Sequence, residues 1–302
     1  MRRFLPTIKE WNLLNYLDFS NLKSANDLEE YFGDRCFKHK EFCHYTSVDV
    51  LDSILEKKEL WISNVNGFND DIDKMQFKNL KKYYSICFSS GINENLPLWY
   101  MYAGLGGKGA RLEWTPTYLK QMVNEGSFYL CEKLTDYRLN GNKLKEITHL
   151  EKDKTIKIEF RDVLYQKKDK KYCQLKYNNL TNYIILKDEL DKYAINHIGF
   201  LKGIPWYYEK ETRLLVTLKE EIEMKLDQNK EYVVVLKLKD KWIEHLKIRF
   251  APNVSKDDMH RILEKNGAIR DFVFMTSNIN LSDYEGTVQF DFCKNCSNNR
   301  KS

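Results

Sequence analysis

Apolar residues recur at two different spacings along the chain, and their alternation predicts a mixed fold. Segments such as 83–90 and 231–239 are short apolar runs of strand length, whereas 48–60 places apolar residues three and four positions apart, as on one face of a helix. Ser47 directly precedes this helical pattern and is a good N-cap residue. The pattern therefore predicts an α+β protein in which short strands and helices alternate.

The same patterns suggest how the chain is organised. We expect residues 1–40 to form a helical N-terminal arm, 41–285 to form the main domain and 286–302 to form a C-terminal tail. Residues from about 115 to 200 show helical spacing with lysine-rich surfaces, which predicts a helical insertion. Within it, "NYIILKDELDKYAINHIGFLK" is expected to be one long amphipathic helix.

Apolar runs return in the last third of the chain. Three of them, at 206–218, 231–239 and 245–250, predict strands. A further helix is expected to begin at Ser255 and to end at Gly267, between two extended segments. This order predicts a β-α-β unit near the C-terminal end of the domain.

Composition and charge exclude some classes of protein. Hydrophobic residues make up 42% of the 302 residues and aromatic ones 14%, which are values of a folded globular chain. The net charge of +5 is too small to indicate nucleic-acid binding by itself. Neither a signal-peptide pattern in "MRRFLPTIKEW" nor an apolar run of bilayer length is apparent, so we expect a cytoplasmic protein without membrane contact.

The seven cysteines do not form a regular framework, which is typical of free thiols in a reducing compartment. Cys293 and Cys296 alone have metal-like spacing. A zinc site needs four ligands, and no second Cys or His pair lies nearby, so no metal is expected.

The polar pattern at the head of the 206–218 run is the first candidate for chemistry. On a strand, alternate residues share a face, so Glu209, Glu211 and Arg213 are expected to point one way and the apolar residues the other. The aromatic residues 206–208 are expected to line a cleft, where two carboxylates raise each other's pKa or bind sugar hydroxyls. The simpler alternative is a solvent-facing glutamate pair neutralised by neighbouring basic residues.

Other candidates each have an ordinary structural explanation beside a functional one. His44 follows a short apolar segment, and an isolated histidine is usually structural. Trp99 and Tyr102 lie one helical turn apart, which indicates either core packing or a stacking platform for a flat ring. "GLGGKG", at Gly104–Gly109, matches the dinucleotide fingerprint but lacks the strand before it and the helix after it, so we interpret it as a turn.

The order of the short motifs is more distinctive than any one of them. The motifs follow one another over about residues 40–277 in the order "HYTS", "LWIS", "GFND", "CFS", "LWYMYAGLGGKGARLEW", "VLYQKK", "WYYEKETRLL" and "KIRFAPNVSKDDMHRIL". This order resembles a large bacterial family that is known as a domain of unknown function and has been proposed to be a divergent branch of the ADP-ribosyltransferases. Two positions depart from the family pattern: Asp71 stands in place of a usual proline and Thr212 in place of a common tryptophan.

The resemblance implies a split, strongly bent sheet that holds NAD, as substrate, in a cleft between its halves. His44 would bond to the adenosine ribose, with Tyr45 beside it as support. Ser89 would help to fix the nicotinamide ribose. Tyr102, with Trp99, would stack on the nicotinamide ring, whose positive charge favours an aromatic face.

The resemblance also assigns the chemistry. Glu211 would be the catalytic acid residue, Glu209 would activate the incoming nucleophile, and Arg213 would fix the geometry of both carboxylates within the NAD site. The implied activity is transfer of ADP-ribose from NAD to a macromolecular acceptor, a protein or a nucleic acid, by a toxin or phage-defence effector with a possible antitoxin or immunity partner. Two alternatives stay open, an NAD glycohydrolase and a catalytically inactive module that binds nucleic acid or a partner.

Overall fold

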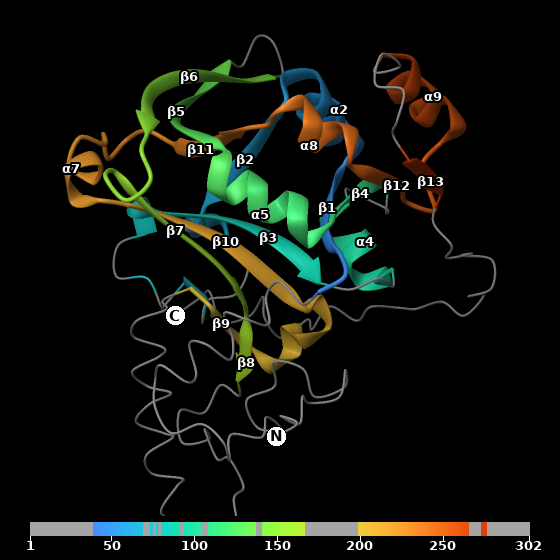
Figure 1. The fold of residues 1–302 in the computed structure, drawn as a ribbon, viewed down its shortest axis with the longest axis horizontal. Helices are drawn as coiled ribbons and strands as arrows, with labels where there is room; N and C mark the ends of the chain where they lie inside the picture. The colour runs from blue at the N-terminus through green and yellow to red at the C-terminus, as the bar shows by residue number, and fades with distance from the viewer. Residues whose placement is uncertain are drawn as a thin grey trace, which may run out of the picture.

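A large antiparallel sheet that does not close on itself organises the molecule (Figure 1). The computed structural model describes residues 39–68, 73–74, 77, 80–90, 94–103, 108–136, 141–166, 199–265 and 273–276. Its strands are β1 (Phe42–Ser47), β2 (Glu59–Asn64), β3 (Tyr83–Ser90), β4 (Gly109–Trp114), β5 (Ser127–Asp136), β6 (Gly141–Leu150), β7 (Ile156–Asp162), β8 (Leu164–Gln166), β9 (Leu201–Gly203), β10 (Glu211–Leu218), β11 (Tyr232–Lys237), β12 (Lys247–Phe250) and β13 (Val273–Thr276).

Short helices connect and cover these strands. They are the α-helices α2 (Val48–Lys57), α4 (Leu96–Tyr102), α5 (Pro116–Glu125), α7 (Glu220–Glu223), α8 (Asp240–Glu244) and α9 (Lys256–Lys265) and the 3₁₀ helices η2 (Val65–Gly67), η3 (Leu80–Lys82) and η5 (Ile204–Glu209). Among the described residues, no helix is long and apolar enough to cross a bilayer. The mixed α+β class predicted from the sequence is confirmed.

The sheet divides at β3. One edge of β3 pairs with β10 from Tyr83 to Ser89, and β10 pairs onward with β7. On the opposite edge, β2 pairs at Tyr84 and Ser85, whereas β1 pairs at Ser89 and Ser90. Two branches therefore leave the same edge at its two ends, β1–β4–β12–β13 and β2–β11–β5–β6. The three residues between the branch points, Ile86–Phe88, lie at the split.

One face of β10 packs into the main core, as the alternation of its apolar residues predicts. Leu214, Val216 and Leu218 are buried there with the apolar stripe of α2. The α2 stripe begins directly after Ser47, whose Oγ accepts a hydrogen bond of 3.3 Å from Val50 N and so caps the helix as predicted. On the other face of β10, Glu211 and Arg213 lie at the start of the strand, and Leu215 packs into a second, smaller core.

The predicted helical insertion at 115–200 is wrong over most of its described part. Only α5 is helical there, and the chain then forms β5, β6, β7 and β8. The reason is visible in "IKIEFRD" of β7, where apolar and charged residues alternate with the period of two that belongs to a strand. Most of the predicted long helix lies outside the described residues, and its last residues, 199–202, lead into β9 instead.

The C-terminal predictions are largely confirmed. The strands expected at 231–239 and 245–250 are β11 and β12, and β12, α9 and β13 form the expected β-α-β unit with parallel pairing. Ser255 Oγ accepts a hydrogen bond of 3.1 Å from Asp258 N at the start of α9. The arm up to residue 38, residues 104–107 of the glycine-rich turn, Gly267 and the tail with Cys293 and Cys296 lie outside the described residues.

Candidate functional site

A cavity of about 170 Å³ opens on the polar face of the sheet, beside the split at β3. Most residues predicted from the sequence to form a site line this cavity: His44, Tyr45, Ser89, Tyr102, Glu209, Glu211 and Arg213. They come from β1, β3, α4, η5 and β10. Segments that are far apart in the sequence therefore converge on one place.

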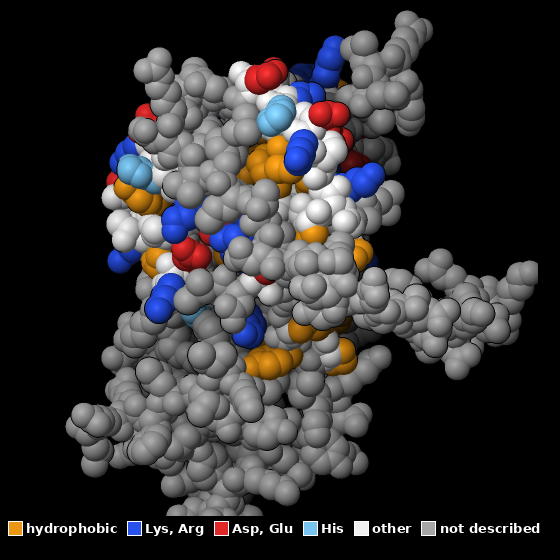
Figure 2. Space-filling model, turned by 90° about the vertical axis from the view of Figure 1, so that its right-hand side faces the viewer, with side chains coloured by type: hydrophobic (Ala, Val, Ile, Leu, Met, Phe, Trp, Pro, Cys, Tyr) orange, Lys and Arg blue, Asp and Glu red, His pale blue; other side chains and the backbone are white. Residues whose placement is uncertain are grey.

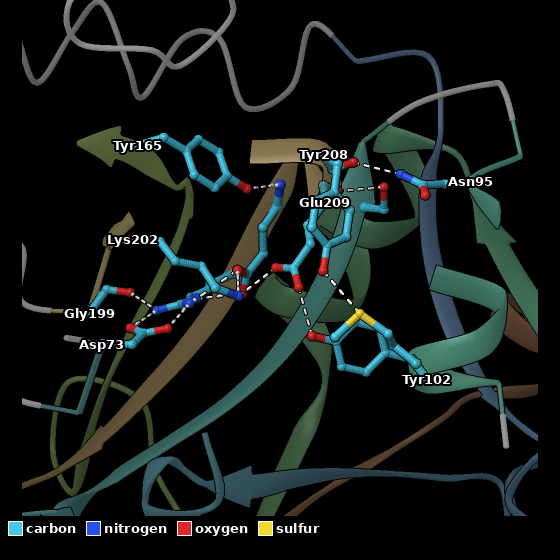
Figure 3. Close-up of polar contacts among 12 residues, drawn as sticks. Asp73, Asn95, Tyr102, Tyr165, Gly199, Lys202, Tyr208 and Glu209 are labelled. Carbon is cyan, nitrogen blue, oxygen red and sulfur yellow. Dashed lines mark hydrogen bonds and ion pairs between the residues drawn. The ribbon is translucent and has the colours of Figure 1, made fainter. Parts of the chain in front are cut away.

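Glu211 is clamped by the arginine two residues along its own strand. Arg213 Nε and Nη2 donate hydrogen bonds of 2.5 and 3.0 Å to the two carboxylate oxygens of Glu211. The other Arg213 donors go to the Asp73 carboxylate and to the Gly199 carbonyl (Figure 3). All five donors of the guanidinium are thus used within the protein, so Arg213 orients Glu211 and has no donor left for a ligand.

The charges around Glu211 keep it ionised. Burial alone would raise the pKa of this carboxyl, which is 2% exposed. Arg213 and Lys202 outweigh burial and hold the pKa of Glu211 well below its usual range. At neutral pH the Glu211 carboxylate therefore contributes a negative charge to the lining of the cavity.

Glu209 has the opposite character. Burial, and then the negative charge of Glu211, raise the pKa of Glu209 to about 7, although Lys202 and Tyr102 act in the lowering direction. Tyr102 Oη donates a hydrogen bond of 2.7 Å to Glu209 Oε1, and Lys202 Nζ lies 2.5 Å from Glu209 Oε2 (Figure 3). A carboxyl with this pKa exchanges its proton near neutrality, as a general acid or base does.

The two glutamates share the cavity without sharing a strand face. The predicted strand 206–218 is wrong in its first part, because Glu209 ends the 3₁₀ helix η5 and only Glu211 begins β10. Lys210, between them, has a left-handed backbone with φ 45°. Its carbonyl accepts hydrogen bonds from the backbone N–H and the hydroxyl of Ser90. This turn brings both carboxylates to the same cavity.

Ser89 supports the same turn from the end of β3. Its Oγ donates a hydrogen bond of 2.7 Å to the carbonyl of Glu209, and Ser89 also lies opposite Glu211 in the strand register. The hydroxyl lines the cavity and keeps lone pairs for a ligand donor.

His44 sits at the split of the sheet, where β1 has left β3. Its Nδ1 lies 3.0 Å from the carbonyl oxygen of Cys87, and because a carbonyl only accepts, Nδ1 carries the proton. Burial lowers the pKa of His44, so the ring is neutral at physiological pH. The Nε2 of this tautomer is an acceptor, suited to a ligand hydroxyl.

The two aromatic residues of α4 have different positions. Tyr102 lines the cavity, whereas the ring of Trp99 is fully buried and packs edge-on against Tyr45 at 4.9 Å. Trp99 Nε1 donates to a carboxylate oxygen of Glu94 at 3.1 Å. The predicted stacking role therefore fits Tyr102, while Trp99 belongs to the core. Tyr45 lines the cavity, and its Oη accepts a 3.2 Å hydrogen bond from the backbone N–H of Asn95.

Thr212, one of the departures from the family pattern, has a packing role. Its hydroxyl donates a hydrogen bond of 2.6 Å to the fully buried carboxylate of Asp162, and His39 Nε2 lies 2.9 Å from the same carboxylate. The side chain thus faces away from the cavity and links β10 to β7 and to the start of the described chain.

Sequence reasoning missed two charged residues of the site. Asp73 lies behind Arg213, and Lys202 bridges the two glutamates. Asp73 follows the "GFND" motif closely, which was a usable signal, whereas Lys202 was hidden in a segment expected to be helical. In the part of the chain that the structure describes, no group of His, Cys, Asp and Glu side chains has the arrangement of a metal site.

No protein-family model, curated protein sequence or solved structure matches the chain. Fold and cavity together define the class: a mixed α+β protein with an open antiparallel sheet and a buried carboxylate pair beside a split in that sheet. The resemblance to the ADP-ribosyltransferase-like family stays a prediction, and the geometry of the cavity is the basis for a proposed function.

Proposed function

We propose that the protein is an enzyme that cleaves NAD and transfers the ADP-ribose to a macromolecular acceptor. One observation carries the proposal: a single cavity holds an ionised glutamate, a second glutamate with a pKa of about 7, a neutral histidine and the ring of a tyrosine. These groups suit a substrate that combines sugar hydroxyls with a flat, positively charged ring.

The chemistry of the lining fits the nicotinamide ring and the ribose hydroxyls of NAD. Tyr102 offers a ring to the nicotinamide, whose positive charge favours an aromatic face. Glu211 accepts a hydrogen bond from the 2′-hydroxyl of the nicotinamide ribose, and His44 Nε2 accepts one from the adenosine ribose. The cavity of about 170 Å³ is smaller than the roughly 300–1,000 Å³ of typical small-molecule pockets, so part of the dinucleotide extends beyond it while ribose hydroxyls reach Glu211 and His44.

Cleavage breaks the bond between the nicotinamide nitrogen and ribose C1′. The bonding electron pair leaves with nicotinamide, which becomes neutral, and positive charge develops on the sugar, as in glycoside hydrolysis. The ionised Glu211 lies where that charge is stabilised. Losing such a preorganised contact costs about 3–4 kcal/mol of transition-state stabilisation, or about a hundred- to thousandfold in rate.

Glu209 serves the second half of the reaction. The acceptor attacks C1′ through a nucleophilic atom, the new bond forms there, and the proton of the nucleophile passes to the Glu209 carboxylate. A pKa of about 7 suits this step, since a base works best with a pKa near the operating pH.

The acceptor is a protein side chain or a nucleic-acid base. Figure 2 shows basic, acidic and apolar side chains interspersed over the described part of one face, so the charges visible there do not select one acceptor class. The family resemblance adds the proposal that the enzyme acts as a toxin or a phage-defence effector, with an antitoxin or immunity partner.

An NAD glycohydrolase is the second candidate. The observation in its favour is the depth of the carboxylates: Glu209 is 4% exposed and Glu211 2%. A water molecule reaches so deep a site more easily than a macromolecular side chain does. The third candidate is an inactive module. It has the same cavity but does not cleave NAD, and it binds nucleic acid or a partner.

One assay separates these candidates. Purified protein is incubated with NAD labelled in the adenylate part, with and without cell lysate, and both free nicotinamide and macromolecule-bound label are followed. We expect nicotinamide release together with bound label in the presence of lysate. Release without bound label supports the glycohydrolase, and no release under either condition contradicts an NAD-cleaving enzyme.

Two variants make the assay specific for the site. Glu211→Gln removes the charge while keeping the shape, and it is expected to reduce release about a hundred- to thousandfold. The exposed Glu221→Gln is the matched control for removal of a glutamate. Equal activity of Glu211→Gln and the control contradicts the catalytic role of Glu211.

A further inference from the structure

Lys202 lies at the centre of the site. It belongs to the short strand β9, which pairs in parallel with β8, and it is 7% exposed. Its Nζ lies 2.5 Å from Glu209 Oε2 and 3.0 Å from Glu211 Oε2 (Figure 3). The same ammonium lies 5.0 Å from the centre of the Trp206 ring.

We propose that Lys202 is a positioning residue of this site: by bridging the two carboxylates it keeps Glu209 turned into the cavity and controls its proton. An ammonium has three N–H donors. Two of them are engaged by Glu209 and Glu211, and the face of Trp206 covers the ammonium. Lys202 also lines the cavity, and its two hydrogen-bonded donors act on the glutamates.

The groups around Glu209 show why the Lys202 ammonium controls the protonation of this carboxyl. The titratable and charged side chains around the two glutamates are Asp73, Cys87 of β3, Tyr102 of α4, Tyr165 of β8, Lys202 of β9, Arg213 of β10 and Tyr208 next to Glu209 in η5. Arg213 is fully committed to Glu211, Asp73 and Gly199.

Among these groups, Lys202 is therefore the cation that contacts Glu209. Burial and the charge of Glu211 favour protonated Glu209, and the attraction of the Lys202 ammonium opposes both. Without the ammonium, the Tyr102 hydroxyl is the hydrogen-bond partner that Glu209 keeps among the described residues. The negative charge of Glu211, which Arg213 holds ionised, then raises the pKa of Glu209 further, and Glu209 ionises only at higher pH.

The test measures the ionisation of Glu209 without any substrate. Protein labelled with ¹³C at glutamate side-chain carboxyls is titrated by NMR, and the Glu209 signal is identified by its loss in Glu209→Gln. We expect Lys202→Met to raise the pKa of Glu209 by about one unit or more, which is a tenfold loss of the ionised form at a given pH. Lys202→Arg, which keeps the charge, is expected to leave it close to the wild-type value.

Two further variants keep the test decisive. Lys202→Gln removes the charge but keeps a donor, and it replaces Lys202→Met if that variant does not fold. Lys157→Met, which removes a half-exposed lysine paired with Glu159 on β7, is the matched control and is expected to leave the Glu209 titration unchanged. An unchanged pKa in the charge-removing variants, or the same shift in Lys202→Arg, overturns the proposal.

The catalytic part of this inference rests on the proposed function and is measured separately. In Lys202→Met, the pH at which transfer of label to the acceptor reaches half its maximum is expected to rise together with the pKa of Glu209, and Lys202→Arg restores it. If the wild-type protein releases no nicotinamide while the NMR shift is present, the proposed function fails and the control of Glu209 by Lys202 stands. If transfer is present but its pH profile does not move in Lys202→Met, Lys202 is only structural.

Discussion

At the scale of single residues, the site consists of two carboxyls with opposite properties. Glu211 is surrounded by Arg213 and Lys202, which keep it ionised, whereas Glu209 has one cation, one hydroxyl and a neighbouring negative charge. Different environments thus give two identical side chains different protonation states near neutral pH, as the proposed reaction requires.

The raised pKa of Glu209 has a consequence for stability. In the unfolded chain this carboxyl loses its proton near 4.5, but in the folded protein only near 7. Its contribution to stability is therefore fully present below about pH 4.5 and is lost as the pH rises towards 7. In Glu209→Gln this loss is absent. The difference in free energy of unfolding, variant minus wild type, is therefore expected to rise from pH 4.5 to 7, by up to about 1.4 kcal/mol per pH unit.

Denaturant unfolding at a series of pH values measures this difference. Glu221→Gln, which changes a surface glutamate, is the control and is unfolded at the same pH values. A free-energy difference between Glu209→Gln and wild type that does not change from pH 4.5 to 7 contradicts a raised pKa of Glu209.

Tyr102 has two separable functions, because its ring lines the cavity and its hydroxyl bonds to Glu209. Tyr102→Phe keeps the ring, so NAD affinity is expected to stay close to wild type while transfer of label to the acceptor changes its pH dependence. Tyr102→Ala removes the ring and is expected to weaken NAD binding about 3- to 30-fold, as for the loss of a stacking or cation–π contact. Calorimetric titration with NAD checks this, and equal affinities of the two variants exclude stacking on this ring.

At the scale of elements, the site depends on short and irregular connections. The left-handed residue Lys210 joins η5 to β10, and Asn95 at the start of α4 donates through its side chain to the carbonyl of Tyr208 in η5. These contacts place Tyr102 and Glu209 within hydrogen-bonding distance, although they are 107 positions apart.

The start of β4 lies so close to the residue after α4 that only glycine fits there. A Cβ atom at Gly109 would lie 2.2 Å from the carbonyl oxygens of both Ala103 and Thr46, which are backbone atoms that cannot turn away. Gly109→Ala is therefore expected to lower the free energy of unfolding by about 2–3 kcal/mol, the upper range for overpacking. Since Ala103 follows Tyr102 directly, nicotinamide release is expected to fall as well.

Gly67→Ala is the matched control for this substitution, because its Cβ would meet no atom within 4 Å. Thermal and denaturant unfolding of both variants measure the difference. Equal stability of the two variants would contradict the close approach of β4 to Ala103.

Local sequence patterns predicted most strands and two capped helices correctly. Ser47 and Ser255 cap helices because their hydroxyls act within three residues, a range that a sequence pattern captures. The helices expected between 127 and 166 failed because lysine-rich strands alternate with the period of two but resemble polar helix faces in composition.

At the scale of the whole molecule, the split at β3 creates the site. When β1 and β2 leave the same edge, the carbonyl of Cys87 is bonded by the imidazole of His44. The sequence predicted that His44, Tyr102 and Glu211 would meet, and all three line one cavity. It could not show Lys202 at the centre of this site, because that contact depends on how β9 is placed against β10, which no local pattern encodes.

The most direct measurement of the central claim is a crystal structure of the Glu211→Gln variant with NAD, in which slow cleavage preserves the dinucleotide. The account predicts the nicotinamide ring against Tyr102, the adjoining ribose 2′-hydroxyl at residue 211 and an adenosine ribose hydroxyl at His44. NAD bound on another surface, or no bound NAD in crystals soaked at a saturating concentration, would contradict it.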